Sequence, residues 1–226
     1  MNVLVVAAHP DDEVLGAAGT MARLADEGHE VAVLILGEGA TSRAATRAEG
    51  SAAEVDALAS HSRTAAAELG VTDVEHAGLP DNRFDHVDLL DVVKVVEGAI
   101  GRTRPTLVFT QHGGDVNIDH KVTFAAVMAA TRPVPGSGVR SVLAFEVGSS
   151  TEWAFGKFTP VFHPTVFYDI TATLDRKLAA MAAYPDEVRP FPHPRSAESL
   201  VAQARRWGST IGVEAAEAFQ LVRELR

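Results

Sequence analysis

Two clusters of histidine and carboxylate residues have the chemistry to bind a metal ion and move a proton. The first is His9-Pro10-Asp11-Asp12-Glu13, and the second is the polar stretch 112–120, which ends in Asn117-Ile118-Asp119-His120. Zinc accepts imidazole nitrogen and carboxylate oxygen, and a catalytic zinc site leaves one position open for water. Bound zinc lowers the pKa of that water, and a nearby carboxylate can take its proton. The residue types therefore favour metal-assisted attack of water on a carbonyl.

A structural role for the same residues is the alternative. An acidic residue after a strand is often only a helix N-cap, and Asp11 or Asp12 could serve in that way. A single histidine at the start of a helix is more often structural than functional. Two such clusters, each after a predicted strand, favour the metal site over two unrelated caps.

The elements that must position these clusters alternate between strand and helix. The apolar run 2–8 is typical of a strand covered on both faces, residues 12–28 have the apolar spacing of a helix, and 31–36 is a second buried strand. Further helices are predicted at 52–69, 88–101 and up to about 130, and further strands at 106–110 and within 139–147. In open α/β sheets, functional groups collect at the carboxyl ends of the strands. The two clusters would face each other if strands 2–8 and 106–110 were neighbours.

The C-terminal part has a less regular pattern. Residues 153–168 are rich in aromatic residues and suggest short strands or hairpins, whereas 172–184 and 196–208 have helical spacing. We therefore expect one α/β domain over residues 1–226, a three-layer Rossmann-like fold. A mostly parallel sheet would carry helices on both faces, with a core to about residue 147 and an irregular C-terminal cap over 148–226.

Composition excludes several classes of protein. The chain has no cysteine, so a metal must be held by His, Asp and Glu. The formal net charge of −10 argues against a nucleic-acid partner. No apolar run is long enough for membrane insertion, and the start of the chain does not resemble a secretory signal, so we expect a cytoplasmic protein. No glycine-rich phosphate loop follows the first strand, which excludes an ordinary nucleotide-binding module. The composition permits a homo-oligomer.

Two segments resemble the metal motifs of the PIG-L or LmbE-like family of zinc-dependent de-N-acetylases. They are AHPDDEVLGAAGTMARLADEGHEV near the N-terminus and GGDVNIDHKV in the middle of the chain; beyond about residue 147 the similarity is weak. The resemblance implies that His9, Asp12 and His120 bind Zn²⁺, although Fe²⁺ or Co²⁺ would suit the same set. It also implies that Asp11 is the general base that deprotonates the zinc-bound water.

The activity implied by the resemblance is hydrolysis of an N-acyl group, above all N-acetyl, from a small-molecule amino sugar or sugar conjugate. The alternative is an amidohydrolase that acts on a non-sugar amide, such as a thiol conjugate or a natural-product intermediate. The residues of the predicted cap would decide between the two.

The second motif departs from the family at one position. Many members have histidine where this chain has Asn117, which can donate a hydrogen bond to an oxyanion but cannot act as an acid near neutral pH. The leaving amine would then take its proton from Asp11, once protonated, or from His112 or His193. Asp115 is a further candidate for substrate binding, or else it shapes the loop. The departure also leaves open a binding protein that keeps the metal and lacks turnover.

Other polar residues have weaker assignments. Asp119 is expected to orient His120 or a neighbouring residue, and Glu13 to lie in the first turn of a helix without binding the metal. Arg43 and Arg47 could bind an anionic group of the substrate, or they are solvated charges. Asp81 is expected either to support the site or to form a turn.

Overall fold

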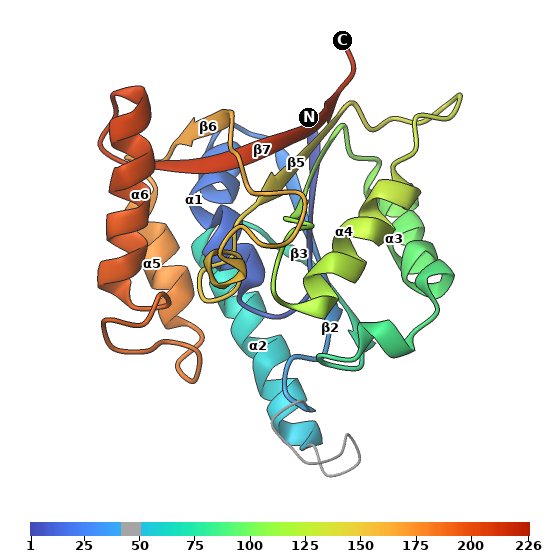
Figure 1. The fold of residues 1–226 in the computed structure, drawn as a ribbon, viewed down its shortest axis with the longest axis horizontal. Coiled ribbons are helices and arrows are strands. Elements are labelled where there is room, and N and C mark those ends of the chain that lie inside the picture. The colour runs from blue at the N-terminus through green and yellow to red at the C-terminus, as the bar shows by residue number, and fades with distance from the viewer. Residues whose placement is uncertain (42–50) are drawn as a thin grey trace.

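The computed structural model describes residues 1–41 and 51–226, which form seven strands and six α-helices (Figure 1). The strands are β1 (Asn2–Ala7), β2 (Glu30–Gly37), β3 (Asp73–Leu79), β4 (Leu107–Gln111), β5 (Ser141–Phe145), β6 (Val166–Asp169) and β7 (Ala216–Glu224). The helices are α1 (Asp12–Asp26), α2 (Ala52–Glu68), α3 (Leu89–Thr103), α4 (Ile118–Ala130), α5 (Leu174–Ala182) and α6 (Ala197–Ile211). Every predicted helix in these ranges is present.

All seven strands belong to one sheet, in the order β3-β2-β1-β4-β5-β7-β6. The first five of these pair in parallel, and β7 runs antiparallel between β5 and β6. The chain moves outward from β1 to β2 and β3, then returns to place β4 on the other side of β1. Because β1 and β4 are parallel neighbours, with Val6 opposite Thr110, the loops that follow them emerge side by side. This is the position where open α/β sheets place their ligand sites.

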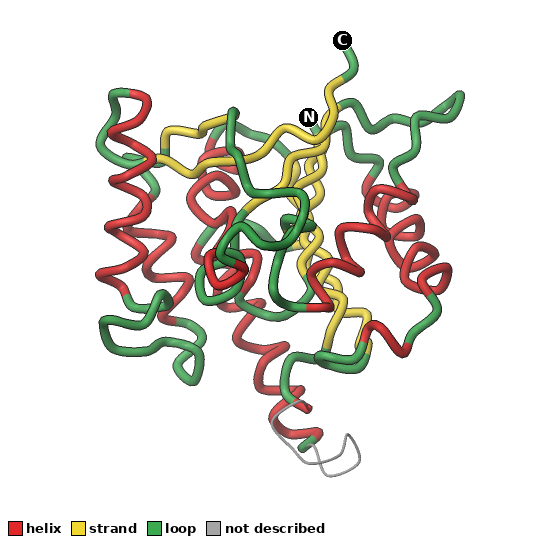
Figure 2. The backbone as a smooth tube through the Cα atoms, in the orientation of Figure 1, coloured by secondary structure: helices red, strands yellow, loops and turns green. Residues whose placement is uncertain are grey.

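Helices cover both faces of the sheet (Figure 2). On one face, Val3 and Val5 of β1 belong to a core cluster that includes residues of α1, α2, α5 and α6. On the other face, Leu4 and Val6 belong to a cluster that includes residues of α3 and α4. Successive residues of a strand point to opposite faces, so a strand covered on both sides must be apolar throughout. The predicted mostly parallel three-layer α/β fold is confirmed.

Two strands are missing from the sequence-based prediction. β3 is an edge strand whose residues are largely half-exposed, and its sequence DVEHAGL has the polar composition of a loop. β7 has the sequence AEAFQLVRE, which is rich in good helix formers. It is nevertheless extended because β5 and β6 hydrogen-bond to it on either side. Pairing with neighbouring strands has overridden local propensity in this segment.

The C-terminal part combines irregular segments with two strands of the main sheet. It contributes β6 and β7 to the same sheet that contains the core strands. The aromatic segment 153–168 forms no hairpin of its own: a short 3₁₀ helix at Glu152–Ala154 is followed by turns and loop until β6 begins. Within 1–41 and 51–226, no helix has the length and apolarity that crossing a membrane would require.

A buried ion pair fixes helix α1 to the C-terminal elements. Lys177 of α5 donates to the carbonyl of Leu15 at 2.8 Å and to the carboxylate of Glu217 at 2.6 Å. Glu217 of β7 also accepts the backbone N–H groups of Gly19 and Thr20, at 3.0 and 2.8 Å. The side chains of both partners are about 95 % buried or more. This pair stabilises α1, the helix whose first turn carries part of the site described next.

Candidate active site

The turn after β1 has an unusual backbone. Asp11 is the N-cap residue of α1 and has φ 101°, in the left-handed region that residues other than glycine rarely occupy. Its carbonyl accepts the N–H groups of Val14 and Leu15, so the backbone caps the helix while the side chain makes no capping bond. The Asp11 carboxylate is therefore available for another role. Such strain at a single residue is typical of functional sites.

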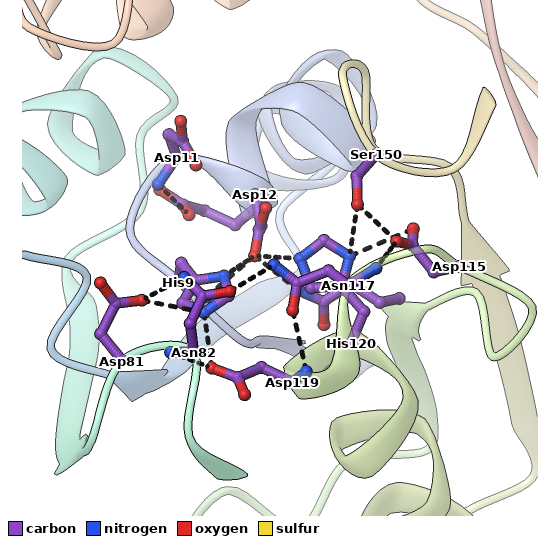
Figure 3. A network of polar contacts seen from close by, with 12 residues as sticks. His9, Asp11, Asp12, Asp81, Asn82, Asp115, Asn117, Asp119, His120 and Ser150 are labelled. Atoms are coloured by element: carbon purple, nitrogen blue, oxygen red, sulfur yellow. Dashed lines mark hydrogen bonds and ion pairs between the residues drawn. The ribbon is translucent and has the colours of Figure 1, made fainter. Parts of the chain in front are cut away.

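His9, Asp12 and His120 meet at one point, as the close-up in Figure 3 shows. Asp12 Oδ2 lies 3.3 Å from His9 Nδ1 and 3.3 Å from His120 Nε2, and the ligand atoms of the three residues lie within 4.8 Å of one another. Asp12 Oδ2 also accepts the Gln111 amide at 2.7 Å. Burial alone would raise the pKa of Asp12, but the two histidines hold it well below its usual value. Two imidazoles and one carboxylate are a donor set that fits zinc with a coordination position left open.

The outer nitrogen of His9 is held by a buried carboxylate. His9 Nε2 lies 2.9 Å from Asp119 Oδ2, and Asp119 also accepts the backbone N–H groups of Asn82 and Phe84 at 2.7 and 2.9 Å. Asp81 Oδ1 lies 3.3 Å from the same nitrogen. Burial would lower the pKa of His9, but its contacts with Asp119 and Asp12 outweigh this and raise it to about 10. Asp119 thus orients the ring so that Nδ1 faces Asp12.

His120 has an equivalent partner on its other side. Its Nδ1 lies 3.1 Å from Asp115 Oδ2. Asp115 accepts the hydroxyl groups of Ser150 and Thr151, the latter at 2.7 Å, and it has no exposed surface. Burial would lower the pKa of His120, but Asp12 and Asp115 raise it to about 9. Each histidine therefore has one nitrogen toward Asp12 and the other toward a carboxylate, as in carboxylate–histidine–zinc sites.

Asp11 lies against an arginine from a distant part of the chain. Arg195 Nη1 donates to Asp11 Oδ2 at 2.7 Å and to Glu187 Oε2 at 2.9 Å, while Arg195 Nε donates to Ser149 Oγ at 2.9 Å. Burial raises the pKa of Asp11 well above its usual value, although Arg195 acts in the opposite direction. A buried carboxylate of this kind can hold a proton between two steps of a reaction.

A cavity of about 200 Å³ opens over these groups. His9, Asp12 and His120 line it, together with Asp11, Asn82, Asn117, Ser150 and Arg195. The cavity therefore brings together the donor set for a metal, a carboxylate of raised pKa and several hydrogen-bonding groups. This combination suits hydrolysis of a polar, uncharged bond such as an amide.

The remaining predicted residues are placed as follows. Asn117 lines the cavity, caps α4 through its Oδ1, which accepts Asp119 N at 2.8 Å, and donates to Asn82 Oδ1 at 3.1 Å. Asp115 does not line the cavity and faces His120. His193 does not line it either, and its Nδ1 accepts the N–H of Arg195 at 3.1 Å.

Four further residues lie away from the cavity or outside the described ranges. His112 is buried and donates to the carbonyl of Pro160 at 2.7 Å. Glu13 accepts the Tyr184 hydroxyl at 2.6 Å and the Asp11 N–H at 3.1 Å, and burial raises its pKa to about 7. Arg43 and Arg47 fall outside the described residues.

Sequence reasoning assigned no role to Asn82 or Arg195. Arg195 stands in a proline-rich stretch whose spacing relates to neither metal motif, and 184 positions separate it from Asp11. Asn82 follows Asp81 in a turn-like segment, where an amide is common for structural reasons.

The chain matches a known family over a little more than its N-terminal half. The model of the family PIG-L, described as GlcNAc-PI de-N-acetylase, matches residues 4–131, which include all three groups of the metal-facing cluster. The chain belongs to the PIG-L family of de-N-acetylases. It is accordingly a metal-dependent deacetylase. The side chains of His9, Asp12 and His120 lie close enough together to hold a metal ion.

The proteins to which this PIG-L protein is similar are named for different activities. It is 30% identical over 156 residues to the uncharacterized deacetylase YaiS of Escherichia coli (strain K12), covering 66% of this chain and 75% of that one. It is 27% identical over 188 residues to a probable N-acetyl-α-D-glucosaminyl L-malate deacetylase 2 of Bacillus cereus, covering 81% and 82% of the two chains. Among solved structures, GalB of Pseudomonas putida KT2440, a 4-carboxy-2-hydroxymuconate hydratase, superposes with a TM-score of 0.78 at 25% identity, covering 100% and 98%.

Proposed function

We propose that this PIG-L protein is a zinc-dependent hydrolase that removes the N-acetyl group from an amino sugar or sugar conjugate. The observation that carries the proposal is the cluster of His9, Asp12 and His120 with the Asp11 carboxylate beside it in one cavity. The family description and the Bacillus cereus relative both name a GlcNAc conjugate, which supports the sugar.

Each residue has a defined task in this reaction. A divalent metal held by His9, Asp12 and His120 would polarise the acyl carbonyl and activate a water molecule. The Asp11 carboxylate takes a proton from that water as the water oxygen bonds to the acyl carbon. Asp11 then gives the proton to the nitrogen as the carbon–nitrogen bond breaks, and the products are acetate and a free amine. Arg195 holds Asp11 in place through its 2.7 Å contact.

This chain has Asn117 where many family members have histidine. The difference affects only the transfer of a proton to the leaving amine. The Asn117 amide lines the cavity and can donate a hydrogen bond to developing negative charge on oxygen. It supplies no proton near neutral pH. We therefore assign the proton transfer to the amine to Asp11. Neither His112 nor His193 lines the cavity.

Purified protein tests the proposal directly. Elemental analysis of wild type should give close to one equivalent of metal, and His120→Ala should lose it. Wild type should release acetate from N-acetylated amino sugars, whereas Asp11→Asn should keep the metal and lose about 10²- to 10⁴-fold in turnover.

Three outcomes separate the alternatives. No bound metal after incubation with zinc at neutral pH would refute the metal-dependent mechanism. Bound metal with acetate release only from non-sugar amides would favour an amidohydrolase of a different substrate class. Bound metal without acetate release from any amide would direct the search to water addition, since the GalB comparison associates that activity with a similar structure.

A further inference from the structure

The backbone of Asp11 is held by hydrogen bonds on both sides of its Cα atom. On one side, its carbonyl accepts the N–H groups of Val14 and Leu15 in the first turn of α1. On the other side, its N–H donates to Glu13 Oε2 at 3.1 Å. The angle φ describes rotation about the bond between N and Cα, so these hydrogen bonds together hold Asp11 at its φ of 101°. A left-handed backbone at such a residue persists only where its surroundings enforce it.

The Glu13 carboxylate is in turn held by a buried tyrosine. Tyr184 donates its hydroxyl hydrogen to Glu13 Oε1 at 2.6 Å, across 171 positions of sequence. Glu13 is 3 % exposed, and Tyr184 has no exposed surface. The Tyr184 ring packs edge-on against that of His61 in α2. Each oxygen of the Glu13 carboxylate therefore has a fixed donor, and hydrogen bonds to a charged group are strong away from water.

Glu13 and Tyr184 act through Asp11 and do not contact the reacting groups. Asp11 lines the active-site cavity, whereas neither Glu13 nor Tyr184 is among the described residues that line it. A purely structural task would be to join α5 to α1. That task is already served by Lys177, which donates to the carbonyl of Leu15 at 2.8 Å. The remaining partner of the Glu13 carboxylate is the backbone of Asp11.

The segment that begins with Tyr184 also holds the side chain of Asp11. Arg195 Nη1 donates to Asp11 Oδ2 at 2.7 Å and to Glu187 Oε2 at 2.9 Å. The Tyr184 carbonyl accepts the N–H of Glu187 at 3.0 Å, so both supports belong to the stretch 184–195 between α5 and α6. One support fixes the backbone of Asp11, and the other fixes its carboxylate.

We infer that Glu13 and Tyr184 are positioning residues for the general base: they hold the Asp11 backbone in the left-handed conformation that keeps its carboxylate in the cavity beside the candidate metal ligands. This inference rests on the proposed deacetylase function. A base must lie within hydrogen-bonding reach of the proton that it takes. Displacing a reacting group by about 1 Å can lower turnover by about 100-fold, so a small relaxation of Asp11 is sufficient for a measurable loss.

Two conservative variants each break one link. Tyr184→Phe keeps the ring and removes the hydroxyl that donates to Glu13. Glu13→Gln keeps the shape of the side chain, but its amide has a single oxygen and cannot accept from both Tyr184 and Asp11. The control is Tyr168→Phe, which changes the other tyrosine of the chain. The Tyr168 ring packs against aromatic rings of the core and does not line the active-site cavity.

Tyr184→Phe and Glu13→Gln should lower kcat for acetate release from N-acetylglucosamine by about 10- to 100-fold, with KM and zinc content unchanged. Tyr168→Phe should keep the wild-type kcat. A double-mutant comparison isolates the route through the base. In an Asp11→Asn background, which already lacks the base, Tyr184→Phe should lower the residual turnover no further. A hydroxyl that only stabilises the fold would lower turnover in both backgrounds alike.

Hydrogen exchange of the Asp11 amide, measured by NMR, reports the same geometry without turnover. In Tyr184→Phe and Glu13→Gln this exchange should accelerate by about twofold to tenfold, while the amides of β1 keep their wild-type rates. Tyr168→Phe should leave the exchange of the Asp11 amide unchanged.

Two results would overturn the inference and leave the proposed function intact. One is a wild-type kcat in Tyr184→Phe, and the other is an equal loss of turnover from this substitution in the wild-type and Asp11→Asn backgrounds. If wild type releases no acetate, the proposed function fails and the exchange measurement separates the two ideas. Faster exchange confined to Asp11 would then uphold the support of its backbone, whereas unchanged exchange in both variants would overturn the inference as well.

Discussion

Replacing Asp119 with asparagine tests whether the buried carboxylates tune the metal site. Asp119 has no exposed surface, and its Oδ2 lies 2.9 Å from the outer nitrogen of His9. Removing the charge weakens the polarisation and orientation of the ring that presents Nδ1 to the metal. Changes of this kind lower metal affinity by about 10- to 100-fold, or roughly 1.4 to 2.8 kcal/mol.

The assay is a zinc competition titration against a chelator of known affinity, performed on metal-free protein. Asp115→Asn provides a parallel test, because Asp115 holds His120 at 3.1 Å with a different set of backbone and hydroxyl partners. Asp91→Asn, in the exposed first turn of α3, is the matched control and should leave the affinity unchanged.

The two variants also distinguish an effect on zinc affinity from an effect on the stability of the fold. Asp119 accepts the N–H groups of Asn82 and Phe84, so its replacement affects the loop after β3 as well. If zinc affinity stayed within twofold of wild type in both variants while thermal stability fell, these carboxylates would be structural only. That result would refute the argument that they act through the histidines.

Four further predictions follow from the buried charges and close packing. Because the pKa values of His9 and His120 are raised to about 10 and 9, zinc binding at pH 8 should release close to two protons, measured by calorimetry in buffers of different ionisation enthalpy. The raised pKa values of the two histidines also stabilise the metal-free protein, and this contribution is fully present below about pH 6.5. It is lost as the pH rises through about 9 to 10, so the thermal stability of metal-free protein should fall between about pH 6.5 and 10. Lys177→Met leaves Glu217 buried without its ammonium partner and should cost about 3–5 kcal/mol in urea unfolding, whereas an unchanged midpoint would contradict the buried pair. Gly16→Ala places a Cβ 2.1 Å from Phe145 Cδ2. The overpacking should lower the free energy of unfolding by about 1–3 kcal/mol, which outweighs the gain of about 1 kcal/mol in helix propensity. A variant more stable than wild type would refute this packing.

The metal cluster could be predicted from the sequence because the information is local. His9 and Asp12 lie on one turn directly after an apolar run that could only be a buried strand, and His120 follows a second strand of the same type. Once β1 and β4 pair in parallel, the two loops must meet. Residue type, spacing and strand position were sufficient for this part of the site.

The rest depended on tertiary contacts that leave no local pattern. β7 has the composition of a helix and is a strand because β5 and β6 supply its hydrogen bonds. Arg195 meets Asp11 across 184 positions of sequence, and Asp119 contacts His9 across 110. Side chains this far apart are brought together by the folded sheet and its loops. The sequence therefore determined the fold class and the group of candidate donor side chains His9, Asp12 and His120, which the structure brings together. Only the tertiary structure decided which charged groups orient them.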